Sequence, residues 1–184
     1  MILGITGSIA SSKGVAAQYF HEHGYNYYTL STEVREEASR RQLPITREQL
    51  QYLGNDLREK EGPDIWMKKI YENQDFSRNS IIDGLRNPAE IEYLKNLSVK
   101  FHLCSVDAHV WIRYQRVLSR NKLSDPKTYF EFVAIDSRDY GIGEPSWGQQ
   151  VRLCMQMADS HLLNESKLDA FVSNLADLYK QLNQ

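Results

Sequence analysis

The chain has 184 residues, of which 41% are hydrophobic and 25% are charged, and its formal net charge is -2. This composition is typical of a globular domain with its own core, and the charge argues against general nucleic-acid binding. No apolar run is long enough to span a membrane, no secretion leader is apparent, and Cys104 and Cys154 lack metal-ligand spacing. We therefore expect one cytoplasmic domain, residues 1–184, and the sequence leaves a homodimer open.

The first part of the chain alternates short apolar strands with helices. Ile2–Thr6 is apolar and β-branched, which favours a buried strand, and Lys13–His23 has helical periodicity that stops at Gly24. We expect four more elements before residue 73: a strand at Tyr25–Leu30 and helices at Thr32–Arg41, Arg47–Lys60 and Asp64–Glu72.

The same alternation continues to the end of the chain. The run "SIIDGL" at Ser80–Leu85 predicts a strand that ends in an acid. We further expect helices at Pro88–Asn96, Ala108–Arg120 and Leu168–Leu182, strands at Val99–Val106 and Ser160–Leu163, and loops around Gln42–Thr46, Asn73–Ser80 and Asp139–Trp147. This order predicts an α/β fold with a parallel sheet covered on both faces, and ligands beyond the carboxyl ends of the strands.

A phosphate-binding loop is suggested between the first strand and the first helix. Gly7 and Lys13 have the spacing of G-x-x-x-x-G-K-[ST], but Ser12 stands where glycine is usual and Gly14 where a Mg²⁺-binding hydroxyl is usual. Such a loop needs inward N–H groups and a helix N-terminus to hold phosphates. The alternative is a glycine-containing turn with an exposed lysine. The expected ATP-binding residues are Gly7, Ser8, Ile9, Ala10, Ser11, Ser12, Lys13, Gly14 and Val15.

The end of the third predicted strand supplies two further candidates. Arg86 lies where parallel sheets bind ligands, so it is expected to contact a phosphorylated acceptor. Asp83 is expected to hold a Mg²⁺-bound water or the acceptor's hydroxyl, because a carboxylate at a buried strand end is costly without a ligand. The alternatives are a surface arginine and an Asp-Gly turn with Gly84.

Helical charges give weaker candidates. Glu33, Arg35 and Arg58 are expected on the acceptor side, although charged helix faces are usually solvated. Arg113, Arg116 and Arg120 share one helix face by their spacing, and we favour Arg116 and Arg120 as part of a lid over the triphosphate. The alternative is a solvated basic face with Asp107 capping the helix. Trp147 suits packing, but its glycine-rich loop could also bring it to a base.

Several segments carry a resemblance to a known group. "GITGSIASSKGVAAQYF" resembles the opening of dephospho-CoA kinases and nucleoside monophosphate kinases, and adenylate kinases also carry glycine after the P-loop lysine. The segment from Glu33 to Gly62, "IIDGLRNPAEIEYL", "VDAHVWIRYQRVLSR" with "DPKTYFEFVAID", and "ADSHLLNES" resemble later blocks of the same group, which includes adenylate-kinase-related proteins and AAA-family ATPases. The resemblance covers nearly the whole chain.

The resemblance implies a P-loop kinase fold, a three-layer α/β/α arrangement around a five-stranded parallel sheet. It implies substrate-side helices at about 31–72, a lid at about 113–146, and ATP with Mg²⁺ as cofactors. The implied reaction is transfer of the γ-phosphoryl group to a (deoxy)nucleoside monophosphate or similar small acceptor, with catalytic residues Lys13, Asp83, Arg86, Arg116 and Arg120. Two alternatives stay open: dephospho-CoA kinase, and a nucleotide-binding sensor with little turnover.

Overall fold

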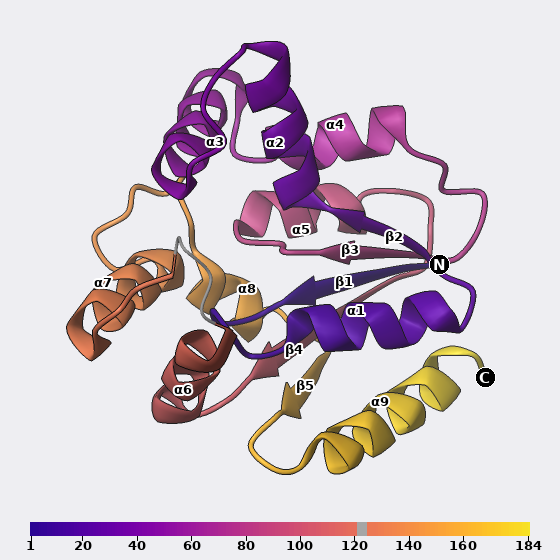
Figure 1. Ribbon diagram of the computed structural model, residues 1–184. Helices are drawn as coiled ribbons and strands as arrows, with labels where there is room; N and C mark the ends of the chain where they lie inside the picture. The colour runs from indigo at the N-terminus through magenta and orange to yellow at the C-terminus, as the bar shows by residue number, and fades with distance from the viewer. Residues whose placement is uncertain (121–124) are drawn as a thin grey trace.

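The computed structural model describes residues 1–120 and 125–184, and residues 121–124 of the expected lid lie outside the described residues. Within the described part, five parallel strands form one sheet in the order β2-β3-β1-β4-β5 (Figure 1). The strands are β1 (Ile2–Thr6), β2 (Asn26–Thr29), β3 (Ser80–Asp83), β4 (Phe101–Asp107) and β5 (Ser160–Leu163).

Helices cover both faces of this sheet. The described helices are α1 (Lys13–Glu22), α2 (Leu30–Arg40), α3 (Arg47–Glu61), α4 (Ile65–Asn73), α5 (Pro88–Lys95), α6 (Val110–Arg120), α7 (Tyr129–Tyr140), α8 (Val151–Gln156) and α9 (Leu168–Leu182). Helices α1 and α9 pack together on one face, whereas α5 and α8 contact β4 on the other (Figure 1). The predicted three-layer α/β/α arrangement is confirmed.

The alternation of side chains along β1 divides the core between the two faces. Ile2 packs into the cluster that includes α3, α4 and α5, whereas Leu3 and Ile5 pack into the cluster that includes α1 and α9. All three side chains are buried. A strand buried on both faces reads as a continuous apolar run, which is why β1 could be predicted from sequence.

The position of β1 in the middle of the sheet fixes where a ligand can bind. Both neighbours of β1 run parallel to it, and Ile5 lies opposite Asp83 of β3 and Cys104 of β4. The carboxyl ends of three strands therefore meet at the loop that follows Thr6. Helices α3, α6 and α7 gather beyond this end of the sheet (Figure 1).

Two helices of the structure were not predicted from the sequence. Helix α7 begins at Thr128, whose side chain forms a capping box with Glu131, and it ends at Gly141 in the left-handed conformation. It overlaps the start of the loop expected at Asp139–Trp147, and the short helix α8 follows that loop. The Thr-x-x-Glu spacing was the available signal for α7. None of the described helices is long and apolar enough to cross a membrane.

Candidate phosphate-binding site

The loop between β1 and α1 has a backbone path that requires a glycine at its start. Gly7 has a φ of 139°, and a Cβ on it would lie 1.9 Å from the carbonyl oxygen of Val106. Ala10 and Ser12 have φ values of 60° and 79°, in the left-handed region that side chains rarely adopt. Residues that alternate between right- and left-handed conformations turn successive backbone N–H groups toward one side of a loop, as in anion-binding nests.

Side chains bind the carbonyl groups of five consecutive loop residues. Lys13 Nζ donates to the carbonyl oxygens of Gly7 and Ser8 at 2.7 and 2.8 Å. The Ile9 carbonyl accepts from Arg113 at 3.2 Å, and the Ala10 carbonyl accepts from Arg116 at 3.4 Å. The Ser11 carbonyl accepts from Asn164 at 3.1 Å. The carbonyl side of the loop is therefore occupied by donors.

The N–H side of the same loop is left available. Within residues 1–120 and 125–184, the N–H groups of Ile9, Ala10 and Ser12 donate to no protein atom. The first turn of α1 carries no acidic residue, so the positive end of the helix dipole is not neutralised there. A loop with bound carbonyls and unpaired N–H groups at a helix N-terminus is suited to bind an anion.

Lys13 lies against this loop among several charges. Burial lowers the pKa of Lys13 below its ordinary value, whereas nearby Asp83 raises it and nearby Arg86 lowers it. Lys13 forms no ion pair within salt-bridge distance in the described part of the chain. A phosphate would supply the counter-charge that this partly buried ammonium lacks.

The two positions that depart from the phosphate-loop pattern differ in their surroundings. Ser12 immediately precedes α1 and has the left-handed backbone usual for glycine, and its side chain forms no capping hydrogen bond. Gly14 is exposed, and a Cβ on it would meet no atom within 4 Å. Of these two departures, only Ser12 imposes a conformational cost on the loop.

The structure brings Asp83 and Arg86 to the loop. Oδ2 of Asp83 accepts a hydrogen bond from the Tyr27 hydroxyl at 3.2 Å, whereas its Oδ1 is buried without a hydrogen-bond partner in the described residues. Arg86 is half-buried and donates to Asp139 of α7 at 2.6 Å. An unpartnered carboxylate oxygen at the end of β3 is where a cation or a bound water would be stabilised.

The oxygen atoms at this site suit a Mg²⁺ ion that is held mainly by phosphates and water. They do not suit a metal ion that is held by protein ligands alone. The described residues contain no group of three or more His, Cys, Asp or Glu side chains that could hold a metal. Mg²⁺ usually keeps several waters and takes only one or two carboxylates in addition to substrate phosphates. Asp83 Oδ1 and the buried, unpartnered hydroxyl of Ser11 are suitable oxygen ligands, either directly or through water.

Asp107 is a second strand-end carboxylate that the sequence analysis treated only as a helix cap. It ends β4, on the other side of β1 from Asp83. Its Oδ1 is buried without a hydrogen bond to any described residue and lies 3.7 Å from Nε of Arg113. Helix α6 begins three residues later, at Val110. The signal that would have revealed Asp107 was an acid at the end of a strand next to β1.

The three arginines of α6 do not form one solvated face. Arg113 is buried and makes two hydrogen bonds to Asp136 of α7, and its guanidinium lies over the ring of Phe132. Arg116 also donates to the carbonyl of Asn164 at 2.7 Å, and Arg120 makes two hydrogen bonds to Asp125. Arg113 and Arg116 therefore hold the loop, whereas Arg120 does not reach it in this structure.

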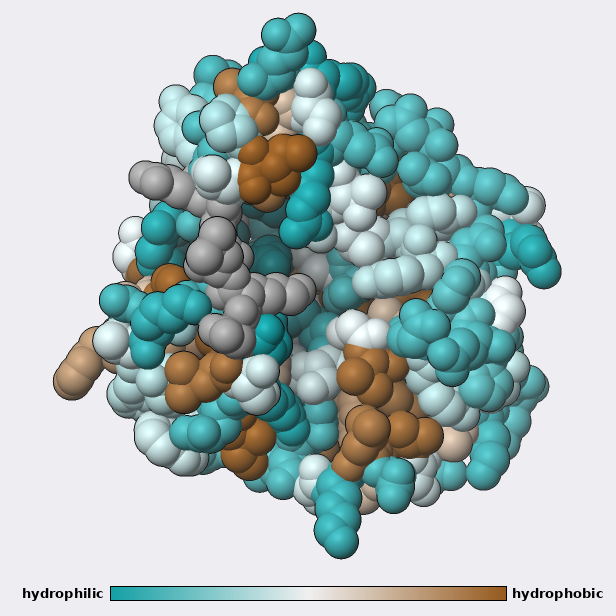
Figure 2. Space-filling view, viewed as in Figure 1, coloured by the Kyte–Doolittle hydropathy of each residue, from teal (hydrophilic) through white to brown (hydrophobic). Residues whose placement is uncertain are grey.

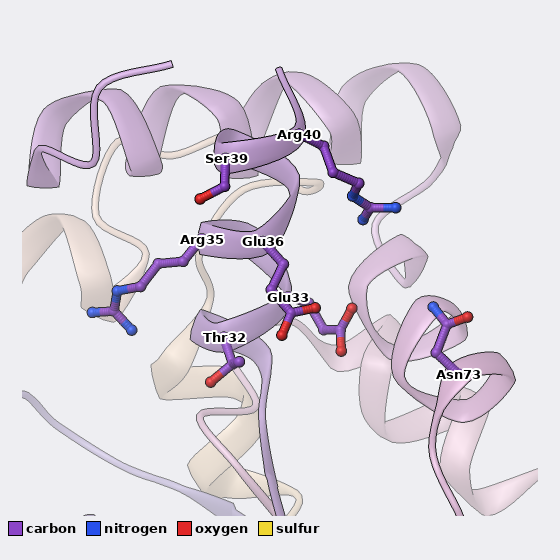
Figure 3. Close-up of a pocket in the computed structure, with 7 residues that line it drawn as sticks. All are labelled: Thr32, Glu33, Arg35, Glu36, Ser39, Arg40 and Asn73. Atoms are coloured by element: carbon purple, nitrogen blue, oxygen red, sulfur yellow. The ribbon is translucent and has the colours of Figure 1, made fainter. Parts of the chain in front are cut away.

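The expected acceptor residues on helices are not brought together. Glu33 and Arg35 line an open depression of about 530 Å³ between α2 and α4, but Arg35 points away from Glu33, toward the other side of α2 (Figure 3). Burial raises the pKa of Glu33, which accepts from Gln74 at 3.4 Å. Arg58 is buried in an ion pair with Glu90 at 2.9 Å.

Sequence reasoning missed a second depression. It has a volume of about 390 Å³ and lies between α3, the end of α7 and the loop before α8. Its lining residues are Gln51, Tyr52, Asn55, Asp56, Glu59, Arg138 and Trp147. Figure 2 also shows a hollow near the centre of this face, lined in part by hydrophilic side chains.

No protein-family model matches the chain. Among proteins of similar sequence, a UPF0200 protein from Pyrococcus furiosus is 30% identical over 192 residues, covering 99% of this chain and 97% of the relative. A UPF0200/UPF0201 protein from Archaeoglobus fulgidus is 31% identical over 186 residues, covering 98% of this chain and 55% of the relative.

Solved structures of similar fold include P-loop kinases. A shikimate kinase from Bacteroides thetaiotaomicron has a TM-score of 0.61 at 10% identity, covering 100% of this chain and 99% of that one. A shikimate kinase from Aquifex aeolicus has a TM-score of 0.58 at 14% identity, covering 100% and 98%. At these identities the likeness shows the P-loop kinase fold, and it does not distinguish the dephospho-CoA and nucleoside monophosphate kinases that the sequence resembles.

Proposed function

The chain belongs to the UPF0200 family, and we propose that it is an ATP-dependent kinase that transfers the γ-phosphoryl group to a (deoxy)nucleoside monophosphate or a similar phosphorylated small molecule. The observation that carries the proposal is the loop from Gly7 to Ser11, whose five carbonyl groups are bound by side chains. This arrangement leaves the loop's N–H groups to bind phosphates, with the Lys13 ammonium beside them.

Phosphoryl transfer needs positioning and charge neutralisation more than covalent chemistry. The loop N–H groups and the N-terminus of α1 would hold the donor's phosphates, and Lys13 would exchange its carbonyl partners for phosphate oxygens. Arg113 and Arg116 would act indirectly, because their hydrogen bonds keep the carbonyls of Ile9 and Ala10 turned away from the bound phosphates.

Mg²⁺, when bound, neutralises charge on the phosphates of the donor. Asp83 is the residue best placed to hold it, through the unpartnered Oδ1 or an intervening water. Tyr27 fixes the carboxylate from the other side by donating to Oδ2. The absence of a hydroxyl at Gly14 is compatible with this role, because a water can take its place on Mg²⁺.

The acceptor's own phosphate is expected at Arg86. This side chain follows β3, is half-buried and, within the described residues, pairs with one carboxylate, that of Asp139. An incoming phosphate would compete with that carboxylate for the guanidinium, which pairs well with either group. Arg86 lies three residues after Asp83, so the phosphates of donor and acceptor would meet at the end of β3.

A second candidate function, a nucleotide-binding sensor with little turnover, is favoured by one observation. Ser12 carries a side chain at a φ of 79°, where phosphate loops usually have glycine. A Cβ at this position can reduce the fit of the β-phosphate to the loop. The sensor and the kinase share the ATP site and differ in turnover.

Lys13→Ala tests the shared site and the reaction together. We expect ATP affinity to fall at least about tenfold, because hydrogen bonds to charged groups contribute roughly 1.5–3 kcal/mol. Calorimetry measures ATP binding, and ADP release with a panel of nucleoside monophosphates and dephospho-CoA measures transfer. Lys180→Ala is the matched control, because Lys180 is an exposed lysine on α9.

Three outcomes separate the candidates. Equal ATP affinity in the parent and Lys13→Ala would place the nucleotide elsewhere and reject both functions. Tight ATP binding without transfer to any acceptor would reject the kinase and leave the sensor. Transfer to dephospho-CoA alone would replace the nucleoside monophosphate with that acceptor.

A further inference from the structure

The depression between α3 and α7 has the chemistry of a binding site for a flat ring. Tyr52 of α3 is 67% exposed although it is a large aromatic residue, and Trp147 comes from the loop on the opposite wall. Aromatic side chains at an open pocket offer stacking surfaces to bases of any kind. The pocket therefore has apolar surface for a ring, and its polar groups decide which ring fits.

Those polar groups are mostly hydrogen-bond acceptors. Asn55 Oδ1 is buried without a hydrogen-bond partner in the described residues, and Asp56 and Glu59 add carboxylates on the same helix. The lining cation, Arg138, is already paired with Glu144 at 3.2 Å. A ligand that carries N–H donors would satisfy the Asn55 oxygen, whose burial without a partner is otherwise unfavourable.

Hydrogen bonds connect the wall of this pocket to Asn87, the residue that follows Arg86. Asn87 Nδ2 donates to the carbonyls of Ser146 and Gly148, the two neighbours of Trp147, at 2.9 and 2.8 Å. The Gln150 N–H also donates to the carbonyl of Arg86. On the other wall, Arg138 precedes Asp139, the partner of Arg86. A ligand in the pocket would thus extend to Arg86.

We propose that this pocket binds the base of the acceptor nucleotide and selects bases that carry an amino group, namely adenine, cytosine or guanine. The proposal rests on the kinase function above, because it places the acceptor's phosphate at Arg86. Stacking on Tyr52 and Trp147 would hold the ring, and the amino group would donate to Asn55 Oδ1. Uracil and thymine offer one ring N–H between two carbonyl oxygens, and these oxygens would face the acceptors of the pocket, so both bases would pair less well with Asn55 Oδ1.

Binding of AMP, CMP, GMP and UMP, measured by calorimetry without ATP, tests the pocket separately from transfer. We expect at least one amino-bearing nucleotide to bind about tenfold or more tightly than UMP, and Asn55→Leu to remove that difference. Trp147→Ala should weaken all four by about tenfold, because base stacking contributes roughly 1–3 kcal/mol. Trp111→Ala is the matched control: Trp111 is 52% exposed on α6, outside the pocket.

Each result bears on the site or on the function. The site would be overturned if Trp147→Ala and Asn55→Leu bind the nucleotides as the parent does and have the parent's circular dichroism spectrum. This would hold even if ADP release shows transfer. Equal affinity for UMP and the other three, or no binding of any of them, would overturn the selection of amino-bearing bases. Selective binding that both variants lose, without transfer in the parent, would support the site and reject the kinase function.

Discussion

Ser12 shows how one backbone angle can matter more than the chemistry of a side chain. Its φ of 79° and ψ of 33° lie in the left-handed region, which costs roughly 1–2 kcal/mol for a residue other than glycine. Its hydroxyl forms no capping hydrogen bond that would offset this cost. Gly14, the other departure from the pattern, has open space around it.

Ser12→Gly is therefore expected to increase the free energy of unfolding by about 1 kcal/mol and to tighten ATP binding or raise kcat. Gly14→Ser is the matched control, because a side chain at Gly14 meets no atom within 4 Å. Thermal unfolding, calorimetry and steady-state ADP release on both variants measure these effects. If Ser12→Gly matches the parent in all three, serine occupies this conformation without cost and our explanation is wrong.

Helix α7 is the element that pairs two arginines of the candidate site with acids. Asp136 pairs with buried Arg113, which holds the loop, and Asp139 pairs with half-buried Arg86, which faces the expected acceptor. The two carboxylates are three residues apart on one face of the helix. The same helix thus supports the loop through one pair and occupies the acceptor's arginine through the other.

Asp139→Asn and Asp136→Asn should therefore have different effects. Asp139→Asn removes the carboxylate that competes for Arg86, so the KM of the acceptor is expected to fall about threefold to tenfold. Asp136→Asn removes the closer of the two carboxylates that pair with the buried Arg113, so it should lower the free energy of unfolding and weaken ATP binding. Acceptor kinetics and thermal unfolding compare them. A higher acceptor KM in Asp139→Asn would mean that Asp139 binds the acceptor.

On the scale of the whole molecule, the sequence reveals what is local and misses what folding brings together. Gly7 and Lys13 could be singled out because a strand, a loop and a helix follow one another along the chain, and Asp83 because it ends a predicted strand. The depression between α3 and α7 could not, because its lining residues lie at 51–59 and at 138–147. No local pattern links two segments so far apart, and α7 itself was not predicted.

Arg58 is the clearest case of a charge whose role depends on a distant partner. The sequence suggested either an acceptor-site residue or a solvated helix charge, but Arg58 is 5% exposed and pairs with Glu90, which is fully buried. Glu90 also accepts from the N–H groups of Arg86 and Asn87 at 2.7 and 3.1 Å. The pair therefore joins α3 to the start of α5, directly behind the residue expected to bind the acceptor.

Arg58→Leu should lower the free energy of unfolding by about 3–5 kcal/mol, because it leaves the Glu90 carboxylate buried without a counter-charge. Adding Glu90→Gln should restore part of that loss, since a neutral amide oxygen can still accept from Arg86 and Asn87. Arg35→Leu, at an exposed position on α2, should change stability by no more than about 0.5 kcal/mol. Denaturant unfolding of the four proteins measures these differences. A stable Arg58→Leu protein with a raised acceptor KM would instead return Arg58 to the acceptor site.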